Sequence, residues 1–358
     1  IEAKRLGIKT GTAIEDAKTI YPKIILVHGE PRKYSSTTKK FIEIFERYTD
    51  RVEIFSIDEA FLDLTDSAHL FGGPEKIALR IKKEIREEIG EWVSCSIGLS
   101  HNKFLAKLGS DLEKPDGLVK IDHGNLDSIL LTVPLGDYCG IGSRLEARLA
   151  GLRVRTTADL RRCPELVLKK EFGLCTARHL KSMAYGLDSS PVISWREQSP
   201  AKSFSHSRTM NRNIRDESEL KKQLFFLAEK LAKKLRDEDY WAKEVGLWLR
   251  FKNFQGAGKT ARLSKWSCDG EEIYHSAVKL LSFMKVSEPV RAIGVYAGLV
   301  QPAKNIPKSF LAEDIKNEQI VGLIDRVNNR FGEDKLIRAG LYGLKLKEVV
   351  SGMGRKKF

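Results

Sequence analysis

The sequence predicts an α+β fold divided among several domains. The chain has 358 residues, which is more than one hydrophobic core ordinarily organises. Hydrophobic residues make up 42% and charged residues 31%, a balance typical of a globular chain. Helix-type and strand-type periodicities alternate in two regions, and glycine-interrupted helical segments lie between them. This alternation favours sheets covered by helices, with a helical domain in the middle of the chain.

The first region, residues 1–119, predicts an antiparallel sheet with helices packed on it. Apolar residues recur at helical or strand spacing, and Pro and Gly mark the element ends. The expected elements, in order, are a helix over 11–20 that stops at Pro22, a helix over 36–49, strands over 52–54 and 60–64, a helix over 74–89, a strand over 93–99 and a helix over 104–112 capped by Ser100. Residues 201–302 predict strand, helix, strand, strand, helix and strand, and a further helix is expected over 313–330.

Charge and cysteine content narrow the class of partner. Lys+Arg number 62 against 48 Asp+Glu, so the net charge of +14 favours a polyanion, nucleic acid before an anionic membrane. No run approaches the roughly 18 apolar residues of a membrane span, and no signal-peptide pattern is present. The five cysteines lack CxxC spacing, which indicates reduced thiols, no zinc site and a cytoplasmic location.

Asp58 and Glu59 are the candidate metal ligands. They lie where the two strands expected around Val52–Ile54 and Ala60–Leu64 meet. Neighbouring residues of a regular strand point to opposite faces, so two adjacent carboxylates act together only where a strand turns. Phosphoryl transfer on nucleic acid uses two Mg²⁺ ions about 4 Å apart, and Mg²⁺ prefers carboxylate and phosphate oxygens. A solvated hairpin tip is the alternative interpretation of the pair.

Three segments carry longer motifs in order: residues 51–65 (RVEIFSIDEAFLDLT), 96–107 (SIGLSHNKFLAK) and 112–118 (LEKPDGL). They resemble the palm motif and the next two signatures of the Y-family, lesion-bypass DNA polymerases. The Lys-Pro-Asp-Gly form is similar to the DinB, or polymerase IV, branch, and the resemblance covers nearly the whole chain. It implies a right-hand polymerase with an antiparallel ferredoxin-like palm, a helical thumb and a βαββαβ little-finger domain.

The resemblance also implies roles for individual residues. Asp58 and Glu59 would match the second and third metal carboxylates of a site for two Mg²⁺ ions. Lys114 and Lys4 would contact the phosphates of the incoming dNTP. Family members often have tyrosine where Ile1 stands, so one phosphate contact departs from the pattern.

The start of the chain departs from the family pattern as well. The first residue is not Met, and the chain opens inside a helical pattern, so we expect the natural N-terminus to lie upstream. The family's first strand carries the first catalytic aspartate and an aromatic gate against ribonucleotides. The resemblance places both before Ile1. Two of three metal carboxylates are therefore expected here, and little activity of the chain as it stands.

Two further segments are candidate DNA contacts. Gly140, Ile141 and Gly142 precede a helix expected over 144–149, and such a turn exposes backbone N–H groups that bind a DNA phosphate. By itself, Gly-x-Gly is better explained by an ordinary tight turn, but its position matches the helix-hairpin-helix of the family thumb. The second segment is a strand of the last domain, for which a solvated sheet face is the alternative interpretation.

In the last domain one expected strand has a core face and a cationic face. The core face consists of Val245, Leu247, Leu249 and Phe251, and the other face of Gly246, Trp248, Arg250 and Lys252. Neighbouring strands add the cations Arg208, Lys259, Arg262 and Lys265. A face of this kind suits phosphate contacts along a duplex, as in the family's little finger.

Some features leave the partners open. Residues 223–226 (QLFF) superficially resemble a sliding-clamp peptide, but they fall inside an amphipathic helix and are expected to be core. A sliding clamp therefore stays an open question, and a monomer is expected. Residues 325–332 resemble C-terminal extensions of bacterial relatives, and a basic tail over 355–357 follows.

The resemblance predicts a template-directed DNA polymerase for low-fidelity translesion synthesis in DNA damage tolerance, with primer–template DNA and dNTPs as partners. The expected domains are a fingers remnant (1–29), a palm (30–119), a thumb (120–190), a linker (191–200), a little finger (201–302) and a basic C-terminal extension (303–358). The alternatives are a catalytically silent DNA-binding paralogue in a mutagenesis complex and a structural nucleic-acid-binding module. The intact Asp58 and Glu59 argue against a silent copy, which is free to lose them.

Overall fold

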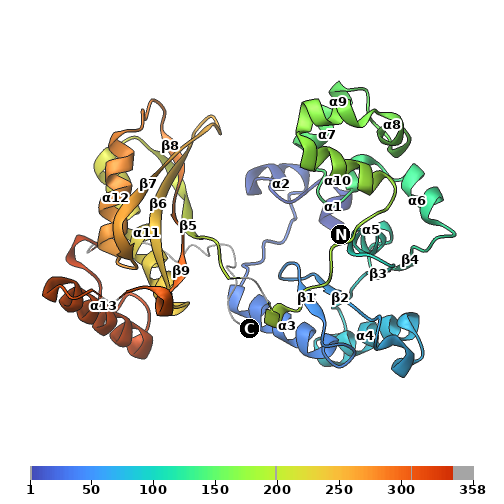
Figure 1. The fold of residues 1–358 in the computed structure, drawn as a ribbon, viewed down its shortest axis with the longest axis horizontal. Coiled ribbons are helices and arrows are strands. Elements are labelled where there is room, and N and C mark those ends of the chain that lie inside the picture. Colours follow the sequence, from blue (N-terminus) through green and yellow to red (C-terminus); the bar gives the residue numbers. More distant parts are fainter. Residues whose placement is uncertain (1, 198–199, 308, 342–358) are drawn as a thin grey trace. The chain divides into compact units, whose positions relative to one another are not determined.

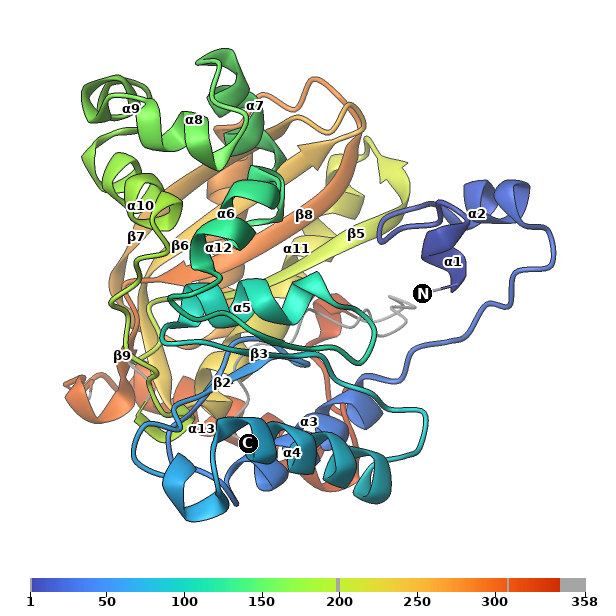
Figure 2. The ribbon, with the colours of Figure 1, turned by 90° about the vertical axis from the view of Figure 1, so that its right-hand side faces the viewer.

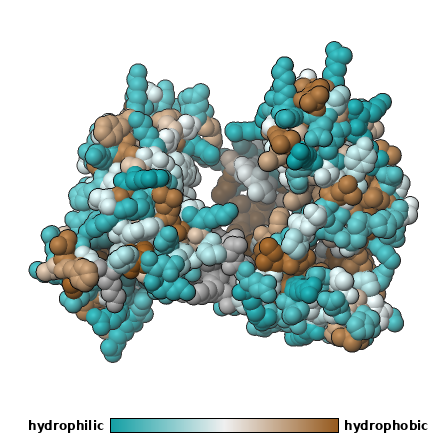
Figure 3. Space-filling view, viewed as in Figure 1, coloured by the Kyte–Doolittle hydropathy of each residue, from teal (hydrophilic) through white to brown (hydrophobic). Residues whose placement is uncertain are grey.

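The computed structural model describes residues 2–197, 200–307 and 309–341. The chain divides at residues 198 and 199 into two compact units, and each contains both helices and strands (Figure 1). No helix in the described ranges is both long enough and apolar enough to cross a membrane. The face seen in Figure 3 is mainly hydrophilic, with apolar patches scattered over it. The five cysteines are free thiols, as expected.

The first unit begins with helices and two pairs of short strands. Its elements up to residue 120 are α1 (Glu2–Arg5), α2 (Ile14–Ile20), α3 (Pro31–Phe45), β1 (Val52–Ile54), β2 (Ala60–Leu62), the 3-10 helix η1 (Ala68–Phe71), α4 (Pro74–Glu88), β3 (Ile97–Leu99), α5 (Lys103–Leu112) and β4 (Leu118–Lys120). Helix α3 starts five residues earlier than expected, because Pro31 at its first turn has the fixed φ that a helix start needs. The prediction that Ser100 caps α5 is wrong: the Asn102 side chain accepts the Leu105 N–H, and the Ser100 hydroxyl donates to the Ile121 carbonyl.

The strands of this unit pair in two different ways. Strands β1 and β2 are antiparallel, as expected, whereas β3 and β4 are parallel. The parallel pair arises because α5 returns the chain to the starting end of β3, which makes β3-α5-β4 a crossover unit. Gly98 permits this packing: a Cβ atom there would lie 1.9 Å from the Ala106 carbonyl oxygen of α5. The three-residue β4 was not predicted, because it is too short to show a period.

Helices form the remainder of the first unit. They are α6 (Leu126–Thr132), η2 (Leu135–Asp137), α7 (Ser143–Gly151), α8 (Thr157–Arg162), α9 (Glu165–Phe172), α10 (Leu174–Ala184) and η3 (Trp195–Glu197). Their buried residues form one core with Leu105 and Leu108 of α5, so the parts expected as palm and thumb share apolar packing. Within the expected linker, the Trp195 indole donates to Glu46 at 2.8 Å, and the Ile193 N–H donates to Glu53 at 2.9 Å.

The second unit contains an antiparallel sheet in the order β5-β8-β6-β7, with the short β9 paired to β6. Its elements are β5 (Phe204–Ile214), α11 (Glu217–Asp237), β6 (Tyr240–Phe251), β7 (Gly256–Ser267), α12 (Gly270–Ser282), β8 (Val290–Gly298), β9 (Gln301–Pro302), η4 (Ala303–Asn305), α13 (Ala312–Phe331) and η5 (Ala339–Leu341). Helices α11 and α12 cover one face of the sheet (Figures 1 and 2). The predicted order of strands and helices is confirmed.

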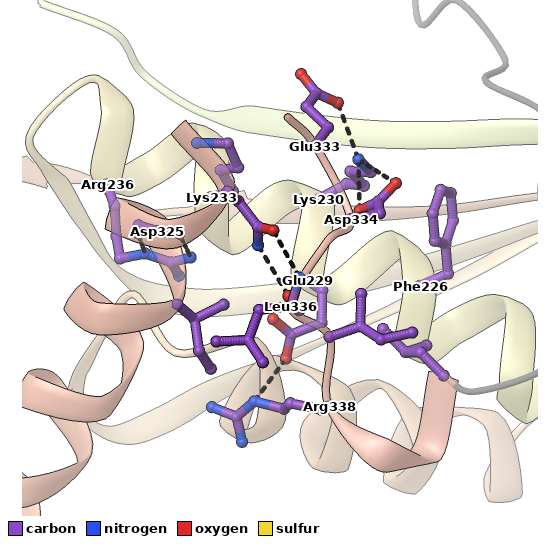
Figure 4. A pocket seen from close by; sticks show the side chains of 14 residues that line it. Phe226, Glu229, Lys230, Lys233, Arg236, Asp325, Glu333, Asp334, Leu336 and Arg338 are labelled. Carbon is purple, nitrogen blue, oxygen red and sulfur yellow. Dashed lines mark hydrogen bonds and ion pairs between the residues drawn. The ribbon is translucent and has the colours of Figure 1, made fainter. Parts of the chain in front are cut away.

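Several ion pairs join the C-terminal segment after the sheet to α11 and to the start of α12, and Figure 4 shows those with α11. The Arg236 guanidinium contacts both carboxylate oxygens of Asp325 on α13, at 2.6 and 2.9 Å. Arg338 contacts Glu229 at 3.1 Å and Asp269 at 2.7 Å, and it also pairs with Glu271. Helix α13 lies within one residue of its predicted bounds at each end. The basic tail over 355–357 lies outside the described residues.

Candidate metal centre and nucleic-acid surfaces

The turn between β1 and β2 carries the acidic pair. The strand ladder closes at the pair Ile54 and Ala60, and the N–H groups of Phe55 and Ser56 both donate to the Glu59 carbonyl, at 3.0 and 3.1 Å. Asp58 therefore lies in a turn and Glu59 at its end, where the alternation of a regular strand does not separate their side chains. The structure thus places the two carboxylates in the way the sequence analysis requires.

Hydrogen bonds hold this turn from both sides. The Ser56 hydroxyl donates to Asp58 Oδ1 at 2.7 Å, and it lies 3.5 Å from Glu59 Oε2. The hydroxyl of Thr38, a buried residue of α3, donates to the Ile57 carbonyl at 2.6 Å. The turn is consequently fixed on a packed helix, which is how rigid elements position a functional loop.

Basic side chains of α5 and the turn after it neighbour the pair. Lys107 Nζ lies 2.9 Å from Glu59 Oε1 and 2.7 Å from Asp111 Oδ2, and Lys114 Nζ lies 2.6 Å from Asp111 Oδ1. Partial burial works against the charge of Lys107, but hydrogen bonds to Asp111 and Glu59 outweigh it and raise its pKa. Partial burial also opposes ionisation of Asp111, yet Lys107 and Lys114 lower its pKa below the ordinary value. Lys107 and Asp111 are therefore both charged near neutral pH.

A cavity of about 880 Å³ brings these residues together with the predicted phosphate contacts. Asp58, Glu59, Lys4 and Lys114 all line it. Its walls are largely apolar and come from β2, β3, α3 and α4; they include Phe41, Phe45, Leu62, Ile77, Ile81 and Leu99. Among the described strands, β2 pairs only with β1, and β3 only with β4, so each has one open edge.

The turn that carries Lys114 is anchored by a buried lysine. Lys82 Nζ donates to the carbonyls of Cys95 and Asp116 at 2.7 and 2.8 Å, and to the Asp116 carboxylate at 2.7 Å. The hydrogen bond from Lys82 lowers the pKa of Asp116. The Lys-Pro-Asp-Gly segment is thereby tied to β3 and α4, which fixes the backbone from which Lys114 projects.

The donor set of the turn suits a magnesium ion. Asp58 and Glu59 offer hard carboxylate oxygens. They are two ligands, and the described residues contain no group of three or more His, Cys, Asp or Glu that could hold a metal ion. Mg²⁺ is commonly held by one or two protein carboxylates together with substrate phosphates and water. The pair meets that requirement, with Lys4 and Lys114 placed at the same cavity for the phosphates.

The glycine turn before α7 is only partly available to a ligand. Gly140, with a φ of +101°, and Gly142 are exposed. Ile141 is buried, and its N–H donates to the Tyr138 carbonyl at 2.9 Å. Of the three residues predicted to contact DNA here, Ile141 therefore supports the turn with its side chain and amide, and the two glycines form the surface.

Strand register sorts the predicted cations of the sheet onto its two faces. Arg250 lies opposite Ala292 and is exposed, on the face that α11 and α12 leave uncovered. Arg262 lies opposite Glu244, on the same uncovered face. Lys252 follows β6 and is exposed. These residues remain candidates for phosphate contact.

The placement expected for Arg208 is wrong. It lies opposite Ile293 and is 8% exposed, so it points to the face that the helices cover. Lys259 lies opposite the buried Leu247, on the same covered face, and Lys265 pairs with Glu272 and Asp314 at 2.7 and 2.6 Å. The physical reason is the two-residue period: Phe204, His206, Arg208 and Met210 share one face of β5.

The uncovered face carries two aromatic rings, of which Trp248 was predicted and Tyr296 was not. A Cβ atom at Gly294 would lie 2.3 Å from the Trp248 indole nitrogen, and one at Gly246 would lie 1.9 Å from the Tyr296 ring. Each ring therefore lies against the backbone of the neighbouring strand at its glycine. Glycine at alternate strand positions opposite an aromatic residue is the signal that could have indicated this.

Comparisons with known proteins agree with this geometry. Residues 1–111 match the model of the impB/mucB/samB family, and residues 201–309 match the model of its C-terminal domain. A DNA polymerase IV of Pelotomaculum thermopropionicum is 33% identical over 95% of this chain and 84% of its own length. One from Moorella thermoacetica is 33% identical over 93% of this chain and 82% of its own length.

Solved structures show the same likeness. A Y-family DNA polymerase chimera of Dbh and Dpo4 is 26% identical, with a TM-score of 0.71 over 84% of this chain and 86% of its own. An insertion ternary complex of Dbh DNA polymerase gives a TM-score of 0.56 at 26% identity, over 83% of this chain and 85% of that one. Fold and relatives together define a DNA-directed DNA polymerase, a nucleotidyltransferase that depends on a divalent metal ion. The chain belongs to the impB/mucB/samB family of Y-family polymerases and is of the DNA polymerase IV type, which acts in translesion synthesis. The predicted family, enzyme class and multidomain α+β fold are confirmed.

Proposed function

We propose that Asp58 and Glu59 hold two Mg²⁺ ions at the site where a dNTP is joined to a primer 3′-OH. The observation that supports this assignment is the shared cavity: both carboxylates and the cations Lys4 and Lys114 line it. When bound, the ions supply stabilisation of the attacking and leaving oxygens in the phosphoryl transfer. By the resemblance, Asp58 and Glu59 would both serve as ligands of these ions.

The protein's own side chains position the nucleotide. Lys114 and Lys4 bind triphosphate oxygens as point charges and offset their negative charge. The Ser56 hydroxyl, 2.7 Å from Asp58 Oδ1, orients that carboxylate, and the anchored turn keeps it in place. Positioning and electrostatics suffice for this reaction, because phosphoryl transfer of this kind needs no covalent intermediate with the protein.

A further strand between β2 and β3 would complete the palm sheet. Each of these strands has one open edge, and the cavity between them is lined by apolar side chains of the kind that cover a sheet strand. We assign this place to the strand that carries the first catalytic aspartate and the aromatic gate in the family. Adding a synthetic peptide with the sequence of the family's first strand tests this: higher Mg²⁺ affinity with the peptide supports it, and an unchanged affinity contradicts it.

Two surfaces are assigned to the primer–template DNA. Gly140 and Gly142 contact a backbone phosphate, and Arg250, Lys252 and Arg262 contact phosphates along the duplex. Residues 30–119 then serve as palm, 120–190 as thumb and 201–302 as little finger, after a fingers remnant over 1–29. The enzyme acts as a monomer in the cytoplasm. Residues 223–226 lie within α11, where Gln223 and Leu224 are buried, so this segment is not proposed to bind a sliding clamp.

Primer extension with Mg²⁺ tests the metal assignment. The comparison uses the full-length protein, its Asp58→Ala variant and an Asp66→Ala control. Asp66 is also acidic but lies outside the lining of the cavity, with its side chain 76% exposed. We expect Asp58→Ala to lower extension at least 100-fold, about 3 kcal/mol of transition-state stabilisation, and the control to retain it. Undiminished extension by Asp58→Ala would remove the assignment.

A further inference from the structure

Three consecutive ion pairs join the metal centre to the triphosphate end of the cavity. Their nitrogen–oxygen distances are 2.9 Å for Glu59 with Lys107, 2.7 Å for Lys107 with Asp111, and 2.6 Å for Asp111 with Lys114. Lys107 is the least exposed member, at 14% of its side chain, and Lys114 the most exposed, at 54%. The chain thus runs from a proposed metal ligand to a proposed phosphate ligand through two residues with no assigned role.

Lys107 is shared between two carboxylates. Its ammonium group occupies Glu59 Oε1, an oxygen that a metal ion also needs, so lysine and metal compete for Glu59. Asp111 draws the same ammonium group toward α5 and so weakens its hold on Glu59. At the other end, Asp111 holds Lys114, which must leave it in order to reach a phosphate.

We propose that Asp111 is a positioning residue with two effects. By binding Lys107 it leaves Glu59 available to a metal ion, and by binding Lys114 it keeps that lysine from the triphosphate. This inference rests on the proposed function of Glu59 and Lys114. It goes beyond that function in assigning opposite effects on metal and triphosphate to one carboxylate.

Opposite effects follow for single substitutions. Asp111→Asn removes one of the two carboxylates that Lys107 contacts, so Lys107 binds Glu59 more strongly. Metal affinity therefore falls about three- to tenfold. In Lys107→Met the competitor is absent, so metal affinity rises about threefold. In the double variant, Asp111→Asn no longer has a lysine through which to act, so it adds no loss to Lys107→Met.

A double-mutant cycle with Mn²⁺ as the probe tests this. Free Mn²⁺ is measured by electron paramagnetic resonance during titration of the full chain, with Glu113→Gln as a control that removes a nearby charge. No ion pair of Glu113 is found within the described ranges. A loss in Asp111→Asn that vanishes in the double variant, and is absent in the control, supports the proposal. An additive loss, or an equal loss in the control, overturns it, because either would reflect net charge alone.

The triphosphate end is measured separately, with dTTP in EDTA. Asp111→Asn should tighten dTTP binding about two- to fivefold, because Lys114 is released, and adding Lys114→Met should abolish the gain. Unchanged dTTP affinity in Asp111→Asn overturns the proposal. A different result would contradict the proposed function itself: if Asp58→Ala binds Mn²⁺ as well as the parent chain, the metal centre is misassigned. If Asp58→Ala loses Mn²⁺ while the cycle is additive, only the role of Asp111 is wrong.

Discussion

Several partly buried side chains in both units are charged. Burial disfavours their charged form, and hydrogen bonds or ion pairs with neighbouring groups favour it. Lys82, with 10% of its side chain exposed, meets its burial cost with three backbone carbonyls and the Asp116 carboxylate. Arg236 keeps its charge through Asp325 and the Cys268 carbonyl. His206 differs: burial lowers its pKa to about 4, and the nearby Lys234 and Lys230 contribute in the same direction.

This makes His206 a source of acid sensitivity in the second unit. The histidine has a pKa of about 4 in the folded chain and 6.5 in the unfolded chain, so the unfolded chain takes up its proton first as the pH falls. Stability is therefore lost as the pH drops from 6.5 to 4, by up to about 3 kcal/mol. His206→Gln should remove this part of the slope in urea denaturation at several pH values. The exposed His275→Gln serves as control; identical slopes for His206→Gln and the parent chain would contradict the assignment.

At the scale of elements, the β3-α5-β4 unit depends on one close approach. A Cβ atom at Gly98 would lie 1.9 Å from the Ala106 carbonyl oxygen and 2.5 Å from the Ser110 nitrogen. Both contacts are backbone atoms of a packed helix, so relief requires α5 to move. Since α5 carries Lys107 and the turn with Lys114 follows it, such a shift also disturbs the metal centre.

Gly98→Ala should therefore destabilise the first unit by about 2–3 kcal/mol. Gly151→Ala is the matched control, because no atom lies within 4 Å of the place of its Cβ and it ends helix α7. The control should change stability by less than about 1 kcal/mol. Circular dichroism during urea denaturation measures both, and equal midpoints for the two variants would show that α5 does not pack on β3 in this way.

The elements that could be predicted from sequence are those whose signal is local. Helix α2 ends at Ile20 before Pro22, and α13 was found within a residue at each end, because periodicity and chain breakers mark them. The parallel pairing of β3 with β4 could not be predicted, since it depends on a partner twenty residues away in a strand of three residues. The face on which Arg208 lies could have been predicted from sequence. Arg208 is an even number of residues from the apolar Phe204 and Met210, so all three point to the same face of the strand.

The same distinction holds for the site. The motifs identified Asp58 and Glu59 on the β1–β2 turn and Lys114 in the turn after α5, and all three line one cavity. The ion pairs through Lys107 and Asp111 could not be anticipated, because they depend on how α5 is oriented against the β1–β2 turn. Spacing along a sequence contains no such information.

At the scale of the molecule, ion pairs fasten the C-terminal segment to the second unit. Arg338 lies among Glu229, Asp269 and Glu271, and Lys230 lies 3.1 Å from both Glu333 and Asp334. Burial raises the pKa of Glu229, so this carboxylate depends on the neighbouring Arg338 to stay charged. The segment is thus held by charge at several points, and salt weakens such contacts where they are exposed.

Arg338→Ala should loosen this segment by about 1–2 kcal/mol, since it leaves buried carboxylate charge unpaired. Hydrogen exchange of residues 312–341 should accelerate about five- to thirtyfold, while strands β6 and β8 keep their protection. Arg326→Ala, an exposed change on α13 itself, is the control and should leave exchange unchanged. Equal exchange in the two variants would contradict the role given to Arg338.

Whether metal binds at the β1–β2 turn can be measured without polymerase activity. Fe²⁺ substituted for Mg²⁺, with ascorbate and peroxide, cuts a protein backbone next to the bound ion, and mass spectrometry maps the cuts. If Asp58 and Glu59 are ligands, cuts are expected within residues 55–59 and near Lys107 and Lys114, which line the same cavity. These cuts should be lost in Asp58→Ala. Cuts that persist in Asp58→Ala, or that fall instead around Glu229 and Asp269, would contradict the account.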